Sequence, residues 1–206
     1  METSVWSDGQ VQTEDFDTEF LGDRVKVRLL RHAVRMYQSN LRAGTHKTKS
    51  RGELHYRKAP LFKQKGTGRA RVRHQAATQC RHGGIPHGPK PRDYSYHMPK
   101  KARLEALRSA LLSKFRDGEV TLARSFSFPE PKTSRLAGIL DDLGYAKSCL
   151  IIVAERDDNL LLSARNLRRV DVIPADDVNA FHLLHYRNVI ITDDALASLR
   201  KRTDES

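Results

Sequence analysis

The chain has 206 residues, with 37 Lys and Arg against 25 Asp and Glu, so its formal net charge at pH 7 is +12. This length accommodates one domain with an extension, and two cysteines, Cys80 and Cys149, are too few for a disulfide framework, so free thiols in a reducing compartment are expected. No apolar run reaches the length of a membrane span and no secretion signal is visible at the N-terminus, so we expect a soluble cytoplasmic protein.

The first forty residues predict a hairpin followed by a helix. Residues 7–10, Ser-Asp-Gly-Gln, favour a hairpin turn. Apolar residues then recur at spacings of three and four from about Asp23 to Leu41, which predicts a helix capped by Asp23, with Gly44 just past its end. The expected apolar stripe of this helix is Val27, Leu30, Val34, Tyr37 and Leu41.

A strongly basic segment, residues 42–103, comes next. It holds 17 of the 37 Lys and Arg but only two of the 25 Asp and Glu, which makes its net charge +15 and leaves −3 for the rest of the chain. Like charges this dense repel one another and need a polyanion, most commonly nucleic acid, to neutralise them. Because the segment has no apolar period that could bury a face, it is expected to be flexible alone and to order on a polyanion.

Beyond this segment, helical and strand patterns alternate. A helix is expected after Pro99, with its stripe at Leu104, Leu107, Leu111 and Phe115 and its end at Gly118. Strands are expected at 120–123, 149–153, 170–173 and 189–191. Further helices are expected at about 133–143, 158–166, 177–184 and 194–201, the first capped by Thr133 or Ser134 and closed by Gly144.

These patterns predict an α/β fold with a mainly parallel sheet flanked by helices and a long basic extended loop inserted after the first helix. We expect one globular domain, formed by about 1–41 and 99–206, with an extended basic loop at about 42–98.

Two basic groups stand out within the loop, at residues 63–71 and 88–96. Lys and Arg reach phosphates, and Arg does so with two parallel hydrogen bonds. Gly66 and Gly68 allow a tight turn, while Tyr94 and Tyr96 are types that stack on unpaired bases. A short basic run is most often a solvated tail, but this one is long and interrupted by glycines, prolines and aromatics, which favours nucleic-acid binding.

Four motifs, in order and spacing, resemble the bacterial large-subunit ribosomal protein L4 family. They are residues 49–53 (Lys-Ser-Arg-Gly-Glu), 64–71 (Gln-Lys-Gly-Thr-Gly-Arg-Ala-Arg), 88–96 (Gly-Pro-Lys-Pro-Arg-Asp-Tyr-Ser-Tyr) with 99–101 (Pro-Lys-Lys), and 163–172 (Ser-Ala-Arg-Asn-Leu-Arg-Arg-Val-Asp-Val) after Asn159-Leu160. The chain departs from the family at three places: Phe62 stands where the family has Trp, residues 72–78 replace a small-residue stretch, and Cys80 occupies an aromatic position.

The resemblance implies a structural constituent of the large ribosomal subunit that binds 23S rRNA, supports assembly and has neither enzymatic activity nor a cofactor. Its implied partners are rRNA, neighbouring large-subunit proteins and the nascent polypeptide, since the loop tip of the family lines the peptide exit tunnel. By position, the tunnel tip comprises Phe62, Gln64, Lys65, Gly66, Thr67, Gly68 and Arg69. The expected rRNA-binding residues are Lys47, Lys49, Arg51, Arg57, Lys58, Lys63, Lys65, Arg69, Arg71, Arg73, Arg81, Lys90, Arg92, Tyr94, Tyr96, Lys100, Lys101 and Arg103.

Alternative functions remain open at this point. One is a free RNA-binding regulator of its own operon, acting by transcription antitermination or translational repression, which the resemblance also permits. Another is an RNA-acting enzyme. The sequence does not support it, because it shows no clustered carboxylates or activated nucleophile. The spacings of His74, Cys80, His82 and His87 match no paired-ligand zinc pattern, so no metal is expected.

Overall fold

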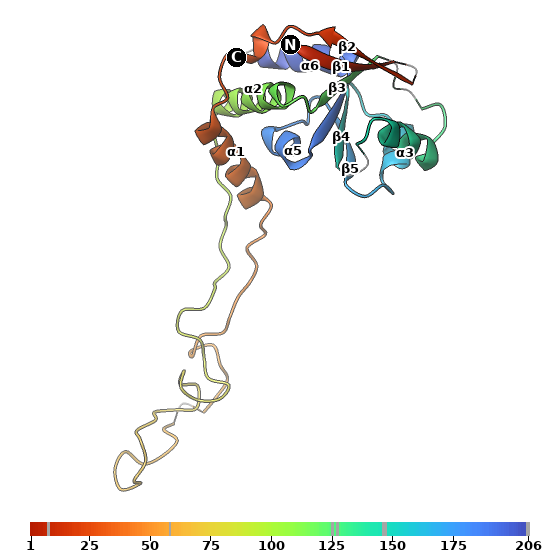
Figure 1. Cartoon of the computed structure of the whole chain (residues 1–206). Helices are drawn as coiled ribbons and strands as arrows, with labels where there is room; N and C mark the ends of the chain where they lie inside the picture. The colour runs from red at the N-terminus through yellow and green to blue at the C-terminus, as the bar shows by residue number, and fades with distance from the viewer. Residues whose placement is uncertain (8, 58, 125, 127, 146–147, 205–206) are drawn as a thin grey trace. The chain divides into compact units, whose positions relative to one another are not determined.

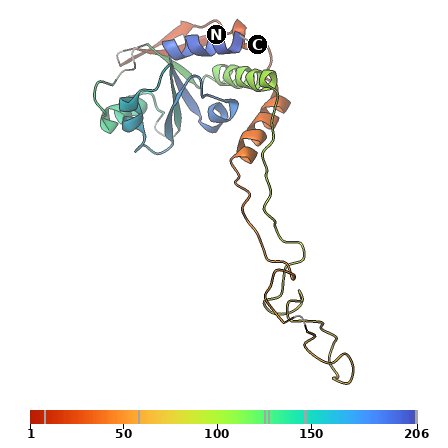
Figure 2. The ribbon, with the colours of Figure 1, turned by 180° about the vertical axis from the view of Figure 1, so that it is seen from behind.

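The computed structural model describes residues 1–7, 9–57, 59–124, 126, 128–145 and 148–204. The chain divides into two compact units. Met1–Gln38 and His97–Ser206 form the first, which we term the α/β unit, and Ser39–Tyr96 form the second, which we term the arm unit. Figures 1 and 2 show the chain from opposite sides.

A six-stranded sheet lies at the centre of the α/β unit. Its strands are β1 (Glu2–Ser7), β2 (Gln10–Asp15), β3 (Val120–Ala123), β4 (Cys149–Val153), β5 (Val170–Pro174) and β6 (Asn188–Thr192). They lie in the order β2-β1-β3-β6-β4-β5, and every neighbouring pair is parallel except the hairpin of β1 and β2. The predicted hairpin and the predicted mainly parallel α/β sheet are both confirmed.

Helices cover both faces of this sheet (Figures 1 and 2). They are the 3₁₀ turn η1 (Glu19–Leu21), α1 (Val27–Asn40), α2 (Lys100–Arg116), α3 (Thr133–Asp142), α4 (Asp158–Ala164), α5 (Ala180–His185) and α6 (Asp193–Asp204). The apolar residues of α1, α2, α5 and α6 pack into one core cluster, and those of α3 and α4 pack into another. None of these helices is long and apolar enough to cross a bilayer.

Strand β4 shows how the sequence builds the two layers. All five of its residues are buried. Because side chains alternate along a strand, Leu150 and Ile152 join the first cluster, while Cys149, Ile151 and Val153 join the second. A strand that is apolar throughout is therefore required here, as the sequence predicted. Burial also raises the pKa of the Cys149 thiol to about 12, so this cysteine acts as a core residue and not as a nucleophile.

Helix α1 differs from its prediction. It begins at Val27 rather than near Asp23, because the Lys26 N–H donates to Ser109 Oγ of α2 and the Lys26 carbonyl accepts from Leu30. The predicted stripe is also partly wrong, since Val27 and Leu41 are 63% and 75% exposed. The buried face of the helix consists of Leu30, Ala33 and Met36.

For two other helices, the predicted position in the sequence agrees with the structure better than the predicted N-cap does. Lys132, not Thr133 or Ser134, occupies the N-cap of α3, and its N–H donates to Ser163 Oγ at 3.0 Å. Helix α4 has a cap that sequence reasoning missed, because the Asp157 carboxylate accepts from the Asn159 and Leu160 N–H groups. The Asp157 cap stabilises the start of α4, whose apolar residues pack into the second core cluster.

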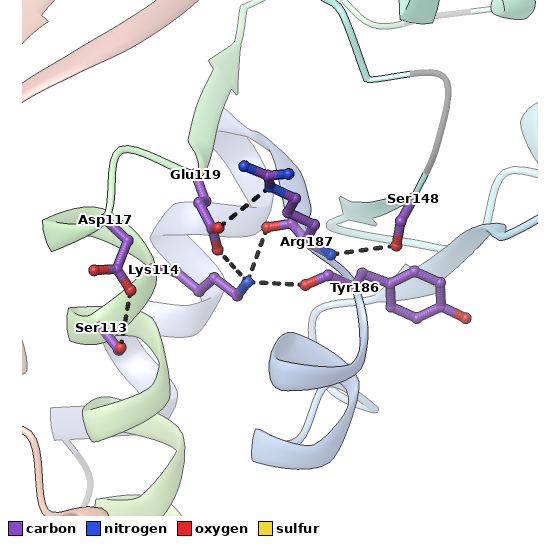
Figure 3. A network of polar contacts seen from close by, with 7 residues as sticks. All are labelled: Ser113, Lys114, Asp117, Glu119, Ser148, Tyr186 and Arg187. Atoms are coloured by element: carbon purple, nitrogen blue, oxygen red, sulfur yellow. Dashed lines mark hydrogen bonds and ion pairs between the residues drawn. The ribbon is translucent and has the colours of Figure 1, made fainter.

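A buried lysine joins α2 to two central strands (Figure 3). The Lys114 Nζ donates to Glu119 Oε2 at 2.5 Å and to the carbonyls of Tyr186 and Arg187 at 2.8 Å each. Glu119 directly precedes β3, and Arg187 directly precedes β6. One ammonium therefore satisfies three acceptors at the point where α2, β3 and β6 meet, and the Lys114 side chain is only 8% exposed.

Candidate nucleic-acid interface

From Leu41 to Tyr96, the arm unit forms neither helix nor strand in its described part. It carries 14 Lys and Arg against two Asp and Glu, so its net charge is +12. Every Lys and Arg of this unit that the structure describes is exposed to solvent. Within the same residues one ion pair forms, between Lys47 and Glu53 at 3.4 Å. Most of the positive charge is thus free to meet an external polyanion.

Two limbs of the arm, residues 42–57 and 84–96, run beside each other and exchange backbone hydrogen bonds. The Arg92 N–H donates to Gly44 O, the Thr48 N–H to Pro89 O, and the Ile85 N–H to Lys49 O, at 3.1–3.2 Å. Gly44 has a φ of +65°, and a Cβ at this position would collide with Arg92 O. The absence of a side chain at Gly44 is therefore a condition for the limbs to approach this closely.

Tyr94 gathers basic groups from both limbs. The guanidinium carbons of Arg42 and Arg92 lie 4.0 and 4.3 Å from the centroid of its ring, and the His46 ring stacks on it at 6.0 Å. A hydrogen bond with Arg92 and the positive charges of Arg92 and Arg42 lower the pKa of the Tyr94 hydroxyl below its usual value. These cation–π contacts hold two arginines together despite their mutual repulsion, so two guanidinium groups stand side by side on one ring.

The tip of the arm turns on two glycines. Gly66 and Gly68 have φ values of +81° and +63°, in the left-handed region that favours glycine. Across the turn, the Arg69 guanidinium lies 5.1 Å from the Phe62 ring centroid. The turn encloses a cavity of about 270 Å³ whose lining includes Phe62, Thr67 and Arg69. The tip is thus a compact loop with Lys65 exposed on it.

The segment that contains His74, Cys80 and His82, which were considered above as possible metal ligands, is a series of tight turns. The Ala77, Cys80 and Gly83 N–H groups each donate three residues back, to the carbonyls of His74, Ala77 and Cys80. The His74 Nδ1 accepts from the Ala76 N–H at 3.1 Å. In the part of the chain that the structure describes, no three His, Cys, Asp or Glu side chains gather as metal ligands would. These residues shape the backbone of the arm.

The other predicted site residues are placed as follows. Lys100, Lys101 and Arg103 lie in the first turn of α2, in the α/β unit. Tyr96 is 43% exposed, and its N–H donates to Asn40 Oδ1 at 3.0 Å. Lys58 lies outside the described residues. The arm unit thus contains the tunnel-tip set and the other predicted rRNA-binding residues.

The carboxyl edge of the sheet, where parallel α/β folds usually bind phosphate-bearing ligands, has the wrong charge for that task. The depression at this edge is lined by Glu155, Asp157, Asp193 and Asp194, against one base, Arg124. Arg124 is moreover paired with Glu14 at 2.6 Å. This depression is therefore unsuited to binding a polyanion.

An α/β unit together with a unit of charge +12 is the combination expected of a protein that binds a polyanion through a basic arm. The model of the ribosomal protein L4/L1 family matches residues 15–202. The chain belongs to this ribosomal protein family. The family is non-enzymatic, so the sequence-based predictions of family and of a non-catalytic role are confirmed.

Relatives named large ribosomal subunit protein uL4 match nearly the whole chain. The protein from Solibacter usitatus is 43% identical over 185 residues, covering 90% of this chain and 89% of the relative. Those from Thermoanaerobacter pseudethanolicus and Rhodopirellula baltica are 42% and 38% identical, covering 91% and 94% of this chain and 89% and 88% of the relatives. The matched region includes the whole arm unit.

Proposed function

We propose that this chain is a structural constituent of the large ribosomal subunit in the cytoplasm, binding large-subunit rRNA through the arm unit and supporting subunit assembly. The observation that carries the proposal is the arm unit itself, in which a charge of +12 stands on exposed side chains of a segment without helix or strand. The names of the relatives support the same assignment.

The arm suits RNA because its charge is distributed along both limbs and not confined to one patch. Exposed Lys and Arg neutralise successive phosphates, and each contact releases counterions from the RNA. The paired limbs and the Tyr94 cluster reduce the number of conformations that must be lost on binding, since part of the arm is already ordered by its own contacts. The arm then serves as a fixed support between RNA segments.

Sucrose-gradient fractionation tests this function directly. We expect the protein to be present in large subunits at close to one copy per particle and to remain there after a high-salt wash, because many simultaneous contacts hold it. A protein that sediments mostly free, or that salt removes completely, would favour the alternative role of a free RNA-binding regulator over the structural one.

We further propose that the tip of the arm, Phe62–Arg69, lies at the wall of the nascent-peptide exit tunnel, as the family resemblance implies. The positive φ values of Gly66 and Gly68 give the tip a tight turn, which suits a confined position. Its Arg69–Phe62 contact keeps one cation folded against the turn, and Lys65 remains exposed as a charge that a passing peptide would meet.

A charge reversal at the tip, Lys65→Glu, tests this placement. It sets an acid against rRNA phosphates, a repulsion of about 1–4 kcal/mol, which moves the tip but leaves the many other contacts of the protein in place. We expect assembled ribosomes with an altered response to tunnel-binding macrolides and to stalling peptides. Lys201→Glu, the same charge change at an exposed position of α6, is the control and should leave both responses unchanged. Wild-type responses from the Lys65→Glu ribosomes would remove Lys65 from the tunnel wall.

A further inference from the structure

We infer that the α/β unit contains a second anion site, a pocket that binds a phosphate group independently of the arm. The pocket is a cavity of about 410 Å³ between helices that are distant in sequence. Its polar lining comes from Tyr37 of α1, Lys100 and Arg103 of α2, Asp176 and Asn179 between β5 and α5, and Arg202 of α6.

The charge of this lining favours an anion. The lining includes three residues with cationic side chains, Lys100, Arg103 and Arg202, and one with a carboxylate, Asp176, so it carries a net charge of +2. The Tyr37 hydroxyl is of a type that donates a hydrogen bond to an anion, whereas the Asn179 side chain is already occupied as the cap of α5, its Oδ1 accepting from the His182 N–H at 2.9 Å. A positively charged lining is not general among the cavities of the α/β unit, because the depression at the carboxyl edge of the sheet is acidic.

Arg202 is held in place by the backbone. Its Nη1 donates to the carbonyl oxygens of Ala175 and Val178, at 2.8 and 3.0 Å. Both bonds use the same nitrogen, so they fix the plane of the guanidinium without using its other two nitrogens. An arginine whose fork is oriented before a ligand arrives loses little freedom on binding phosphate.

Arg103 contributes an unused donor. Its Nε is buried and has no hydrogen-bond partner among the described residues. Buried donors in native proteins are satisfied in the great majority of cases, so each exception needs an explanation, and of the four such groups among the described residues only Arg103 lines this pocket. Because Arg103 also lines the pocket, a phosphate oxygen placed there is a suitable partner for its guanidinium.

The start of α2 adds to the same site. Pro99 occupies its N-cap and no side chain caps the helix, whose first turn contains Lys100 and Lys101 but no acid. Helix N-termini carry partial positive charge and favour anions, so basic residues there repel the helix dipole when no anion is bound. A phosphate in the adjacent pocket would reverse this repulsion.

The chemistry recognised is that of a phosphate group, either within an RNA backbone or as a free phosphate. The inference that the pocket binds a phosphate group does not depend on the proposed function. The inference that this phosphate belongs to RNA does rest on it. Sequence reasoning expected Lys100 and Arg103 to contact rRNA. Tyr37, Asn179 and Arg202 were not expected, because only the fold brings them to the same cavity.

The first test uses the full chain labelled with ¹⁵N-arginine. Sodium phosphate is added at constant ionic strength, with sodium chloride as the matched salt. We expect saturable shifts of the Nε–H signals of Arg103 and Arg202 with phosphate and none with chloride. Asp176→Asn removes the one carboxylate of the pocket and should lower the phosphate concentration at half-saturation. Unchanged arginine signals in phosphate, together with no effect of the pocket variants on RNA binding, would overturn the inference.

The second test separates the two sources of phosphate. The affinity of the full chain for a large-subunit rRNA transcript is measured against salt for Arg202→Gln and for the control Lys201→Gln, which removes the same charge from the neighbouring exposed position. One lost phosphate contact should reduce the slope of log affinity against log salt by about 0.7–0.9 in Arg202→Gln and leave the control unchanged. If circular dichroism shows that Arg202→Gln unfolds, the exposed Lys100→Gln takes its place.

The outcomes distinguish this inference from the proposed function. A pocket that shifts with inorganic phosphate but leaves the salt slope unchanged is a site for free phosphate, which supports the pocket and rejects RNA as its source. A wild-type salt slope that does not depend on the arm would contradict the proposed function and would leave the phosphate titration of the pocket valid.

Discussion

Replacement of residues 46–97 by a short Gly/Ser linker is expected to reduce the salt dependence of rRNA binding by several units. The replaced segment carries 13 of the 14 Lys and Arg of the arm unit. Each phosphate contact that is lost lowers the slope of log affinity against log salt by about 0.7–0.9, so the loss of even half of these contacts changes the slope by several units. Fluorescence anisotropy of a labelled large-subunit rRNA transcript, measured over a range of salt concentrations, gives the slope for both proteins.

The linker variant is expected to keep the α/β unit folded. Neither of the two core clusters contains a residue of the arm unit, so the linker removes none of the side chains that bury apolar surface against the sheet. Far-UV circular dichroism and urea unfolding serve as the control, with an unfolding midpoint close to that of the wild type. A folded variant with an unchanged salt slope would assign RNA binding to the α/β unit instead.

The alternation of strands and helices could be predicted because it depends on short-range patterns. Residues 149–153 are apolar at every position, and the structure buries all of them in β4. The stripe at Leu104, Leu107, Leu111 and Phe115 is likewise buried along α2. In both cases the apolar residues that become buried lie close together in the sequence, so the local pattern of apolar residues is enough to predict which of them are buried.

Helix starts were harder to predict because long-range partners decide them. Ser109 lies 83 residues from Lys26, yet its hydroxyl accepts the N–H at the start of α1. Local reasoning therefore assigned the cap to Asp23, the nearest residue of a suitable type. The pairing of the two limbs of the arm could not be predicted for the same reason. The hydrogen bond between Gly44 and Arg92 joins residues that are distant in sequence, and no periodic pattern of residues indicates it.

The basic character of the arm was evident from charge alone, whereas the pocket at Arg202 was not. Tyr37, Arg103 and Arg202 belong to three helices that pack together only in the folded α/β unit. Lys114 is a similar case, because a lysine next to Phe115 at the end of an amphipathic helix is ordinarily solvated. The structure places it among acceptors from two other segments instead.

Lys114→Met is expected to destabilise the α/β unit by about 2–3 kcal/mol. The substitution preserves side-chain length and apolar contact but removes the ammonium that serves Glu119, Tyr186 O and Arg187 O. A buried polar group left without its partner costs about 1–3 kcal/mol. Glu119 limits the loss, because it is 26% exposed and keeps Arg187 at 3.7 Å, so most of the effect comes from the two backbone carbonyls.

Urea unfolding followed by circular dichroism measures this loss as a lower midpoint with an unchanged m-value. Lys201→Met, at an exposed position of α6, is the control and should change stability by no more than about 0.5 kcal/mol. Equal stability of Lys114→Met and wild type would mean that water satisfies the two carbonyls as well as the ammonium does. A loss confined to Lys114→Met would instead show that one side chain couples the end of α2 to the starts of β3 and β6. It would thereby hold together the unit to which the basic arm is attached.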